Sequence, residues 1–545
     1  PIYPLTKEMA SVGLEQRRLR GIVQFIFDSQ LSIPDFFSNS ILQKYKLIRL
    51  DTALRFIHFP HNNSDLNSAV RRLKFDEHFF LQLLVALKKY NIQKVGTKAL
   101  LDIGPYFKII SESLNFELTK AQKKVIQEIH DDLKISRPMN RLIQGDVGCG
   151  KTIVAILVSS LAVGNNRQVA VMAPTEILAR QHYLSFKNEF DKVNIPCCLL
   201  VGKMKKTERA TILKGLKEGK ISVVVGTHAL IQEDVEFNSL GLVIIDEQHR
   251  FGVNQRLKLQ EKGDNPHLMS MTATPIPRTL SITYHGDMDL SIIDELPKNR
   301  IPVTTKVVDQ IKIEKVYDFI KTKIALGRQA IIVYPLVKES EKSDLAAAVD
   351  AFESLSSFQF SKIKLGLVHG KMNPEEKEKV ISQFNKNRIN ILISTTVVEV
   401  GLDVPNATIM LVEHAERFGL TQLHQLRGRV GRGSEKSYCI LVKRNHSNMS
   451  RTRLAIMERT NDGFLIADED LKLRGPGEVF GQRQSGFFQY KIADIVKDGE
   501  IIREARKLAF DLVKLDPNLC KPFNKDIREV FAKKYSHYLE NLKLI

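Results

Sequence analysis

The stretch GDVGCGKT, Gly145 to Thr152, matches the pattern G-x-x-x-x-G-K-[ST] of a phosphate-binding loop. It follows the apolar run RLIQ and precedes IVAILVSSLAV, which is long enough for a buried helix and too short to span a membrane. A strand, a glycine-rich turn and a helix in this order surround a phosphate group with backbone amides. The stretch therefore predicts a nucleotide-binding α/β domain.

The chemistry of the loop follows from its residue types. We expect Lys151 to neutralise phosphate charge and the Thr152 hydroxyl to ligate Mg²⁺, while backbone amides hold the phosphate oxygens. The residues predicted to bind the nucleotide here are Gly145, Asp146, Val147, Gly148, Cys149, Gly150, Lys151 and Thr152. Kinases, GTPases, transporters and motors all use such loops, so the rest of the chain has to distinguish among them.

Short apolar runs lie on both sides of a proline-containing break, ELPKNRIP, Glu295 to Pro302. Before the break we expect strands at QVAVMAP, ISVVVGTH, LGLVIIDE and HLMSMTAT, and after it at QAIIVYP, KLGLVHG, INILISTT, ATIMLVEH and YCILVKR. Near-continuous Val and Ile runs are typical of strands buried on both faces of a parallel sheet. With helical segments between the runs, they predict an α/β fold with two tandem doubly wound parallel-sheet domains.

The flanking regions read as helical. We expect a helical N-terminal segment over 1–95, the first α/β domain over 96–295, the second over 296–445 and a C-terminal region over 446–545. In that last region two helical segments break at Asn461–Gly463, and the glycine-rich stretch LRGPGEVFGQRQSG follows them as a loop.

The charge composition bears on the class of molecule that the chain binds. The chain has 545 residues, with 81 Lys and Arg against 62 Asp and Glu, for a net charge of +19. Such an excess favours a polyanion such as nucleic acid, although a lysine-rich proteome explains charge alone about as well. The five cysteines form no C-x-x-C pair and indicate a reducing compartment, so we expect a cytoplasmic protein.

The stretch LVIIDEQHRFG ends a predicted buried strand in two carboxylates, Asp246 and Glu247. At the carboxyl edge of a parallel sheet both would lie near the phosphates. We expect Asp246 to hold Mg²⁺ through water and Glu247 to activate the attacking water. Within this motif His249 is a plausible link between hydrolysis and the segment Thr272 to Thr274.

The second predicted domain contains QLRGRVGR, in which Gln425, Gly428, Arg429 and Arg432 match Q-x-x-G-R-x-x-R. An arginine from a separate domain stabilises γ-phosphate charge only when the two domains close, which ties hydrolysis to motion. A kinase or GTPase would leave this second domain unused, and a transporter ATPase would need an LSGGQ-like motif that we do not find. The pattern favours a motor.

The motifs FELTKAQ, GDVGCGKT, APTEILARQH, VVGTHALIQ, DEQHRFG, MTATPIPRTL, STTVVEVGLDVPNA and QLHQLRGRVGR occur in this order. They resemble those of superfamily-two helicases, and within them the RecG family of ATP-dependent DNA translocases. The transcription–repair coupling factor shares TATPIPRTL and HQLRGRVGR. DEQHRFGVNQR, YHGDMDLSIIDELPKNRIPV and the tail DGFLIADEDLKLRGPGEVFGQRQSG favour RecG.

The resemblance implies two RecA-like domains and an ATP- and Mg²⁺-dependent DNA helicase that remodels stalled forks and Holliday junctions in repair and recombination. It implies that Gln122 reads adenine and that Glu399, Gly401 and Asp403 help close the ATP site. The C-terminal region resembles a helical hairpin whose loop, with Arg474, Arg483 and Gln484, couples lobe closure to DNA movement. We also expect a monomer in the bacterial cytoplasm, associated with the nucleoid, that binds double-stranded and branched DNA and no membrane.

Two departures from the family accompany the resemblance. Cys149 stands where the family usually has Ser, and the family's N-terminal wedge is expected to be absent, which would weaken junction specificity. Lys203 to Arg209, KMKKTER, is a candidate DNA contact, with a solvated helix start as the alternative. A transcription-coupled motor and a non-hydrolysing DNA-binding platform with a relic nucleotide site remain as alternative functions.

Overall fold

The computed structural model describes residues 2, 3, 5–29, 33–275, 277, 286–297, 300–335, 341–395, 404–433, 435–444, 448–474 and 490–540. The chain divides into two compact units. The helical unit comprises Pro1–Lys94, Arg278–Asp287 and Gly475–Ile545, and the motor unit comprises Val95–Pro277 and Met288–Arg474. None of the helices in the described ranges combines the length and apolar composition needed to cross a membrane.

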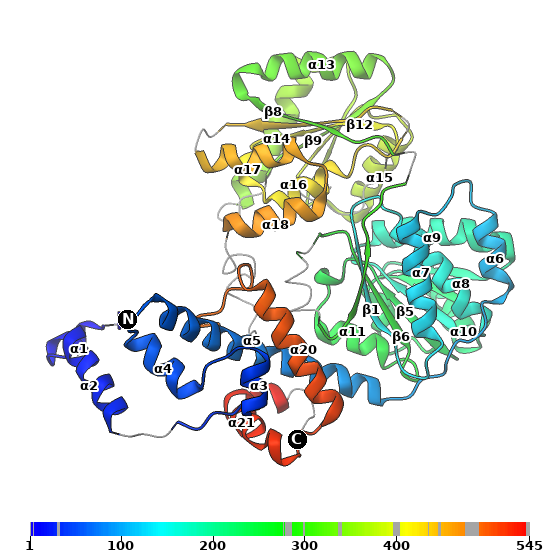
Figure 1. The fold of residues 1–545 in the computed structure, drawn as a ribbon. Coiled ribbons are helices and arrows are strands. Elements are labelled where there is room, and N and C mark those ends of the chain that lie inside the picture. The colour runs from blue at the N-terminus through cyan, green and yellow to red at the C-terminus, as the bar shows by residue number, and fades with distance from the viewer. Residues whose placement is uncertain are drawn as a thin grey trace. The chain divides into compact units, whose positions relative to one another are not determined.

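The first sheet of the motor unit carries the phosphate loop (Figure 1). Its strands are β1 (Asn140–Gly145), β2 (Gln168–Met172), β3 (Cys197–Leu200), β4 (Val223–Gly226), β5 (Leu240–Ile245), β6 (His267–Thr272) and β7 (Asp289–Ile293). They lie in the order β3-β4-β2-β5-β6-β1-β7, and every pair is parallel. The helices of this lobe are α6 (Gly104–Glu112), α7 (Lys120–Leu133), α8 (Lys151–Gly164), α9 (Glu176–Phe190), α10 (Lys206–Lys217) and α11 (Val253–Gln260).

The second sheet has the order β10-β11-β9-β12-β13-β8, and its pairs are again parallel. Its strands are β8 (Thr304–Asp309), β9 (Gln329–Val333), β10 (Leu365–Val368), β11 (Ile391–Ser394), β12 (Ala407–Val412) and β13 (Tyr438–Lys443). Its helices are α13 (Ile313–Ala325), α14 (Glu341–Ser354), α15 (Pro374–Asn385), α16 (Leu420–Arg427), α17 (Asn448–Arg459) and α18 (Gly463–Arg474). Two parallel sheets with helices between the strands confirm the predicted fold class.

The strands that sequence reasoning missed lie at the margins of the sheets. β3 and β7 are the edges of the first sheet and β8 is an edge of the second. Each is half-buried or partly exposed, whereas β2, β5, β9 and β12 are buried at every position. An edge strand faces solvent on one side, so β7 and β8 contain polar residues that interrupt the apolar run, while β3 has an apolar run of only four residues.

The helical unit contains α1 (Lys7–Ser11), α2 (Gln16–Asp28), α3 (Asn39–Lys44), α4 (Leu50–His58), α5 (Asn63–Lys94), α20 (Gly499–Leu515) and α21 (Lys525–Glu540). Its core is aromatic, with Phe36, Phe37, Phe75, Phe79 and Phe80 buried between α5, α20 and α21. These helices confirm the helical reading of 1–95, and α17 and α18 confirm the break at Asn461–Gly463. The domain boundaries proposed from sequence stay predictions.

Candidate nucleotide site and nucleic-acid cleft

The phosphate loop joins β1 to α8 with a backbone that only glycine adopts easily. Gly148 and Gly150 have φ angles of 80° and 88°, in the left-handed region. The Lys151 ammonium donates to the carbonyl oxygens of Gly145 and Asp146 at 2.7 and 2.9 Å, so it lies against the loop. The loop therefore has the conformation and the cation that phosphate binding requires.

Gln122 lies beneath this loop and is almost fully buried. It forms a capping box at the start of α7, accepting from the Thr119 backbone N–H at 2.8 Å, and its amide nitrogen donates to Cys149 O at 2.8 Å. The same residue thus ties α7 to the phosphate loop, and its role with adenine stays a prediction. Cys149 is fully buried, and burial raises the pKa of its thiol, which keeps it protonated.

The two carboxylates at the end of β5 point to different partners. His182 Nε2 of α9 lies 2.8 Å from Asp246 Oδ2, and Asp246 Oδ1 accepts the Glu247 backbone N–H at 3.0 Å. The Glu247 carboxylate accepts the Ala273 backbone N–H at 3.4 Å and lies 3.5 Å from His249 Nδ1. Glu247 is thereby joined to the segment after β6 directly, and the half-exposed His249 contacts that carboxylate.

The environment separates the two carboxylates in acidity. Burial alone would raise the pKa of Asp246, but the hydrogen bond and charge of His182, with Lys151, bring it below its usual value. Burial raises the pKa of Glu247, and the neighbouring charge of Asp246 raises it further. The lowered pKa of Asp246 suits a metal ligand, and the raised pKa of Glu247 suits a proton acceptor.

Helix α16 of the second lobe reaches the first lobe at three points. Gln425 Nε2 donates to Thr274 Oγ1 at 2.7 Å, and His424 Nε2 lies 2.5 Å from Asp146 Oδ1 in the phosphate loop. A Cβ added to Gly428 would stand 2.6 Å from the Cβ of Val147, so glycine permits close approach there. The motif QLRGRVGR therefore meets the phosphate loop and the segment after β6.

The two predicted arginines occupy different positions. Arg429 is buried, and its charge acts on Glu247, whose pKa it lowers against the dominant effect of burial. Arg432 Nε donates to Gly428 O at 3.3 Å, along its own loop. The structure thus brings Arg429 within electrostatic reach of the acidic pair and shows Arg432 bracing the loop that carries Gly428.

Three residues of the site were missed by sequence reasoning: His182, Arg300 and His424. His182 and His424 stand inside the quoted motifs APTEILARQH and QLHQLRGRVGR, so the motifs marked their positions without indicating the acidic partners. The Arg300 guanidinium donates to Val147 O from the break between the lobes. No local pattern indicates that contact.

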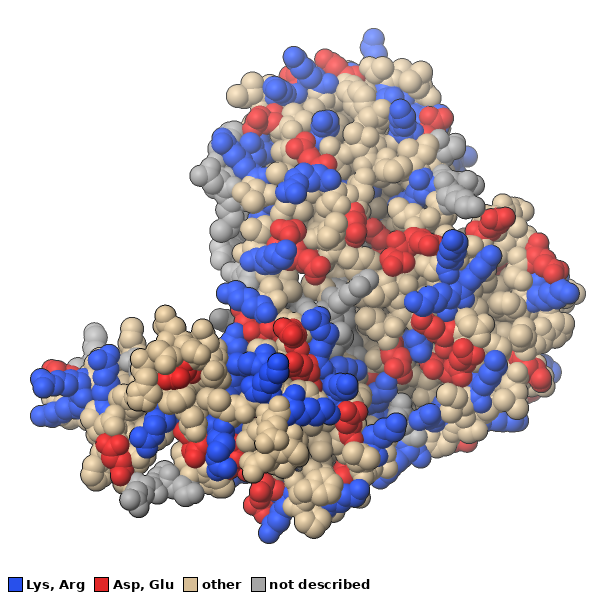
Figure 2. Space-filling model, in the orientation of Figure 1, with Lys and Arg blue, Asp and Glu red and all other residues tan. Residues whose placement is uncertain are grey.

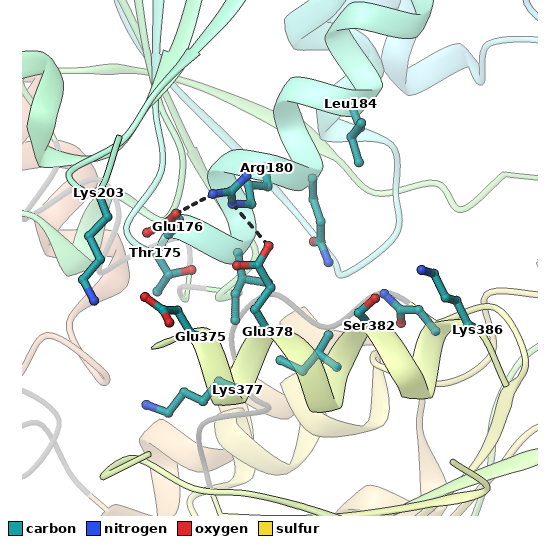
Figure 3. A pocket seen from close by; sticks show the side chains of 14 residues that line it. Thr175, Glu176, Arg180, Leu184, Lys203, Glu375, Lys377, Glu378, Ser382 and Lys386 are labelled. Carbon is teal, nitrogen blue, oxygen red and sulfur yellow. Dashed lines mark hydrogen bonds and ion pairs between the residues drawn. The ribbon is translucent and has the colours of Figure 1, made fainter. Parts of the chain in front are cut away.

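A hollow of about 730 Å³ lies between α9 and α15, one helix from each lobe (Figure 3). Arg180 lies between two carboxylates there, with Glu176 at 2.8 Å and Glu378 at 3.6 Å. Lys203, Lys377 and Lys386 also line it, so this end of KMKKTER faces the cleft. Arginine and lysine side chains, together with the N-terminus of α9 at Thr175, can bind the phosphates of a nucleic-acid backbone without contacting its bases.

Comparison with known proteins identifies the family. Residues 119–282 match the model for DEAD/DEAH box helicases, 311–434 the helicase conserved C-terminal domain, and 460–534 the C-terminal part of domain 3 of the ATP-dependent DNA helicase RecG. The chain is 44% identical over 512 residues to the ATP-dependent DNA helicase RecG of Streptococcus pneumoniae, covering 93% of this chain and 75% of that protein. This chain belongs to the RecG family.

Two further RecG proteins extend the comparison. The chain is 46% identical to RecG of Synechocystis sp., covering 99% of this chain and 64% of that protein. A solved structure of RecG bound to a three-way DNA junction is 43% identical, with a TM-score of 0.72 over 92% of this chain and 66% of that one. The chain thus spans about two thirds of the length of these RecG proteins.

Several residues predicted from the RecG resemblance fall outside the described ranges. These are Glu399, Gly401 and Asp403 in the segment that follows β11, and Arg483 and Gln484 in the coupling loop. Arg474 is the last residue of α18, and its side chain also lies outside the description. Their roles stay predictions.

Proposed function

We propose that this chain is an ATP-driven double-stranded DNA translocase of RecG type that remodels forks and Holliday junctions in repair and recombination. The observation that carries the proposal is the approach of α16 to the phosphate loop, through His424 to Asp146 and Gly428 against Val147. A nucleotide site completed by a second lobe makes hydrolysis depend on lobe closure, as a motor requires.

The proposed hydrolysis uses residues of both lobes. Lys151 neutralises the β- and γ-phosphates, and Glu247 takes a proton from the water that attacks the γ-phosphorus. The bond to the β-phosphate oxygen breaks, so ADP and phosphate leave. Arg429 stabilises the charge that spreads over the γ-phosphoryl oxygens in the transition state.

Mg²⁺ fits this site with a small protein contribution. Thr152 and the ionised Asp246 would hold it, and it would offset the negative charge of the phosphate groups. Across the described residues no group of three or more His, Cys, Asp or Glu side chains forms a metal cage. Phosphate oxygens and water would have to complete its coordination, which suits an ion that arrives with ATP.

The DNA side of the proposal rests on charge and on the relatives. The net charge is +19, and lysines line the cleft between α9 and α15. The solved RecG relative was captured on a three-way junction, which supports branched DNA as the substrate class. Contacts to phosphates rather than bases suit a motor that moves along any sequence.

ATP turnover with and without DNA tests the proposal. We expect duplex DNA to stimulate hydrolysis, and the same preparation to displace the third strand of a triplex when ATP is present. The Arg429→Ala chain should bind ATP but hydrolyse it at least roughly a hundredfold more slowly, because the arginine acts on the transition state. DNA binding without ATP turnover would instead support the static platform.

Competition binding between a fork and a linear duplex tests the choice of substrate. We expect the fork to compete better at equal length if this chain itself engages the junction. Equal competition would confine the proposal to translocation on duplex DNA.

A further inference from the structure

An apolar hollow of about 350 Å³ lies in the second lobe, between the edge strand β8 and helix α13. From β8 it is lined by Thr304, Lys306 and Val308, and from the neighbouring strand β13 by Tyr438 and Ile440. These side chains share one face of the sheet, because side chains alternate along a strand and Thr304 and Lys306 lie opposite Tyr438 and Ile440 in register. We call this hollow the β8–α13 groove.

Helix α13 forms the other wall of the groove with one of its faces. Lys315, Val316 and Phe319 line the groove from the helix, and Lys312 lines it from the position just before the helix begins. Their spacing of three and four residues places them on one side of a helix. Val316 and Ile440 are buried in the apolar core of this lobe, so the floor of the groove is continuous with that core.

Three exposed lysines lie beside this apolar floor: Lys306, Lys312 and Lys315. None of the described residues that line the groove is acidic, and none of the three ammonium groups has an ion-pair partner among the described residues. Like charges gathered on one surface repel one another, and a ligand of opposite charge relieves that repulsion. The groove is therefore complementary to an apolar side chain that is flanked by carboxylates.

The acidic residues of α13 have partners elsewhere. Gln359 Nε2 donates to Glu314 Oε1 at 3.1 Å, and Lys321 Nζ lies 3.2 Å from Asp318 Oδ1. Figure 2 shows Lys and Arg side chains together with Asp and Glu side chains over α13, which lies at the top of the view. The positive charge without a counter-charge thus belongs to the face of α13 that lines the groove.

The free edge of β8 is less suited to a ligand than the groove. Glu458 Oε1 of α17 accepts the Val307 backbone N–H in the middle of β8 at 2.7 Å. A peptide that adds to a sheet as a further strand needs the row of backbone donors and acceptors along that edge, and this contact interrupts the row. A ligand therefore fits over the face of the sheet, in the groove.

The aromatic rings of the groove are already engaged. Phe319 and Tyr438 pack edge to face with ring centres 5.0 Å apart, and Lys323 Nζ lies 5.6 Å and 5.3 Å from the two centres. These contacts take up ring surface on which a nucleic-acid base would stack, and stacking contributes much of the affinity of single-stranded nucleic-acid sites. The groove thus suits an apolar side chain of a protein better than a nucleotide.

We propose that the β8–α13 groove binds an acidic peptide segment of a partner protein. One large apolar side chain of the segment rests on the floor between the sheet and α13, and its carboxylates pair with the three lysines. The groove shares no residue with the nucleotide site or with the cleft between α9 and α15, so the inference does not rest on the proposed function. Such a segment would join this chain to another protein without occupying the nucleotide site.

Selection from a display library of short random peptides on the full 545-residue chain tests the proposal. We expect the selected sequences to combine several Asp or Glu residues with one large apolar residue. Replacing that apolar residue by serine in a selected peptide should weaken binding at least about tenfold in fluorescence anisotropy, because the floor of the groove loses its occupant. A selection that yields no sequence of this kind would overturn the proposal.

Charge reversal in the chain assigns the binding to this groove. Lys306→Glu and Lys315→Glu should each weaken binding of the selected peptide at least about tenfold, since each replaces an attraction by a repulsion. Lys321→Glu is the matched control, because it changes the net charge equally on the same helix as Lys315 but lies outside the groove lining. The control should leave the affinity within about twofold of the unaltered chain. Equal weakening in all three variants would show a response to overall charge and would overturn the assignment.

The same variants separate two other occupants. A single-stranded oligonucleotide that displaces the peptide, and that itself loses affinity in Lys306→Glu, would assign the groove to nucleic acid. A dimer in sedimentation that Lys306→Glu dissociates would assign the groove to a second copy of the chain. Either result would overturn the proposal.

ATP turnover separates this inference from the proposed function. DNA-stimulated turnover in Lys306→Glu should stay within about twofold of the unaltered chain, because the groove shares no residue with the nucleotide site. Parallel loss of turnover and peptide binding would place the groove in the motor and overturn the docking role. A chain that lacks DNA-stimulated turnover but binds the peptide through Lys306 and Lys315 would overturn the proposed function and still support the docking groove.

Discussion

Glu247 has a φ angle of 50°, a left-handed conformation that is rare for a residue with a side chain. It lies two residues beyond the end of the buried strand β5, and its carboxylate accepts the Ala273 backbone N–H. Such backbone strain is concentrated at functional sites, where the surrounding structure holds it. Burial and the neighbouring charge of Asp246 raise the pKa of this carboxylate, so it is the more basic of the two.

Glu247→Gln should leave ATP binding intact and slow turnover by roughly a hundredfold or more, the range of a lost general base. The amide keeps the shape of the side chain but accepts no proton. Lys151→Ala is the contrasting variant, because losing the phosphate cation should weaken nucleotide binding first. Nucleotide titration and steady-state turnover distinguish the two, and full activity in Glu247→Gln would reject the assignment.

Gly428→Ala should slow turnover about tenfold or more, because an overpacked contact costs about 1–3 kcal/mol. The added methyl group would meet three atoms of Val147 within 3.0 Å and hold the lobes apart at the phosphate loop. Val147→Ala removes the two γ carbons but keeps the Cβ at 2.6 Å, so it should rescue the variant in part in the double mutant. A loss that Val147→Ala leaves unchanged would show that Gly428 acts through something other than this contact.

At the scale of elements, α5 is bound to the preceding helices by a buried charge cluster. Arg72 is fully buried with its guanidinium over the rings of Phe36 and Phe37, and it donates to Asp35 at 2.7 and 2.8 Å and to Asp76 at 2.8 Å. One arginine facing two carboxylates leaves an excess negative charge. Burial raises the pKa of Asp76 to about 7, against the attraction of Arg72.

This cluster predicts a pH dependence of stability that Asp76→Asn removes. The folded-state pKa of Asp76 is above its unfolded value, so its stabilising contribution is complete below the unfolded pKa of 3.8 and is lost as pH rises through about 7. Relative to the unaltered chain, Asp76→Asn should therefore gain stability between pH 5 and pH 8, by at most about 1.4 kcal/mol per pH unit. Denaturant unfolding of both chains at the two pH values measures the difference. A constant difference would mean that Asp76 is ionised throughout.

At the scale of the whole molecule, the charge balance and the two-lobed motor unit bear on the same partner. The excess of basic residues gives the chain a net charge of +19, and a lysine-lined cleft runs between helices of both lobes. Arg180 in that cleft is balanced by Glu176 and Glu378, so a phosphate there would compete with a carboxylate for the guanidinium. Electrostatic binding of this kind is independent of base sequence.

Duplex DNA affinity should fall steeply with salt and change little with sequence. If the cleft and its surroundings contact several phosphates, the dissociation constant should rise about a hundredfold or more between 50 and 200 mM salt. Fluorescence anisotropy with two duplexes of unrelated sequence measures both effects. A strong preference for one sequence with a shallow salt dependence would contradict a track-following motor.

The sequence by itself determined the fold class and the positions of the phosphate loop and the acidic pair. Central strands such as β2 and β5 are buried on both faces, so their apolar runs are continuous and the strands can be predicted from the sequence. The phosphate loop and the Asp246–Glu247 pair are contiguous in the chain, and their function depends on local backbone geometry that a short motif encodes.

Only the tertiary structure decided which residues from distant parts of the chain meet. His424 lies beside Asp146 across 278 positions, and Asp287 pairs with Lys88, a partner that the quoted motif containing Asp287 does not indicate. The edge strands β3, β7 and β8 also emerged only there, because their exposure depends on the order of strands in the sheet. Contacts of this kind are set by packing of whole elements, which leaves no periodic or contiguous pattern in the sequence.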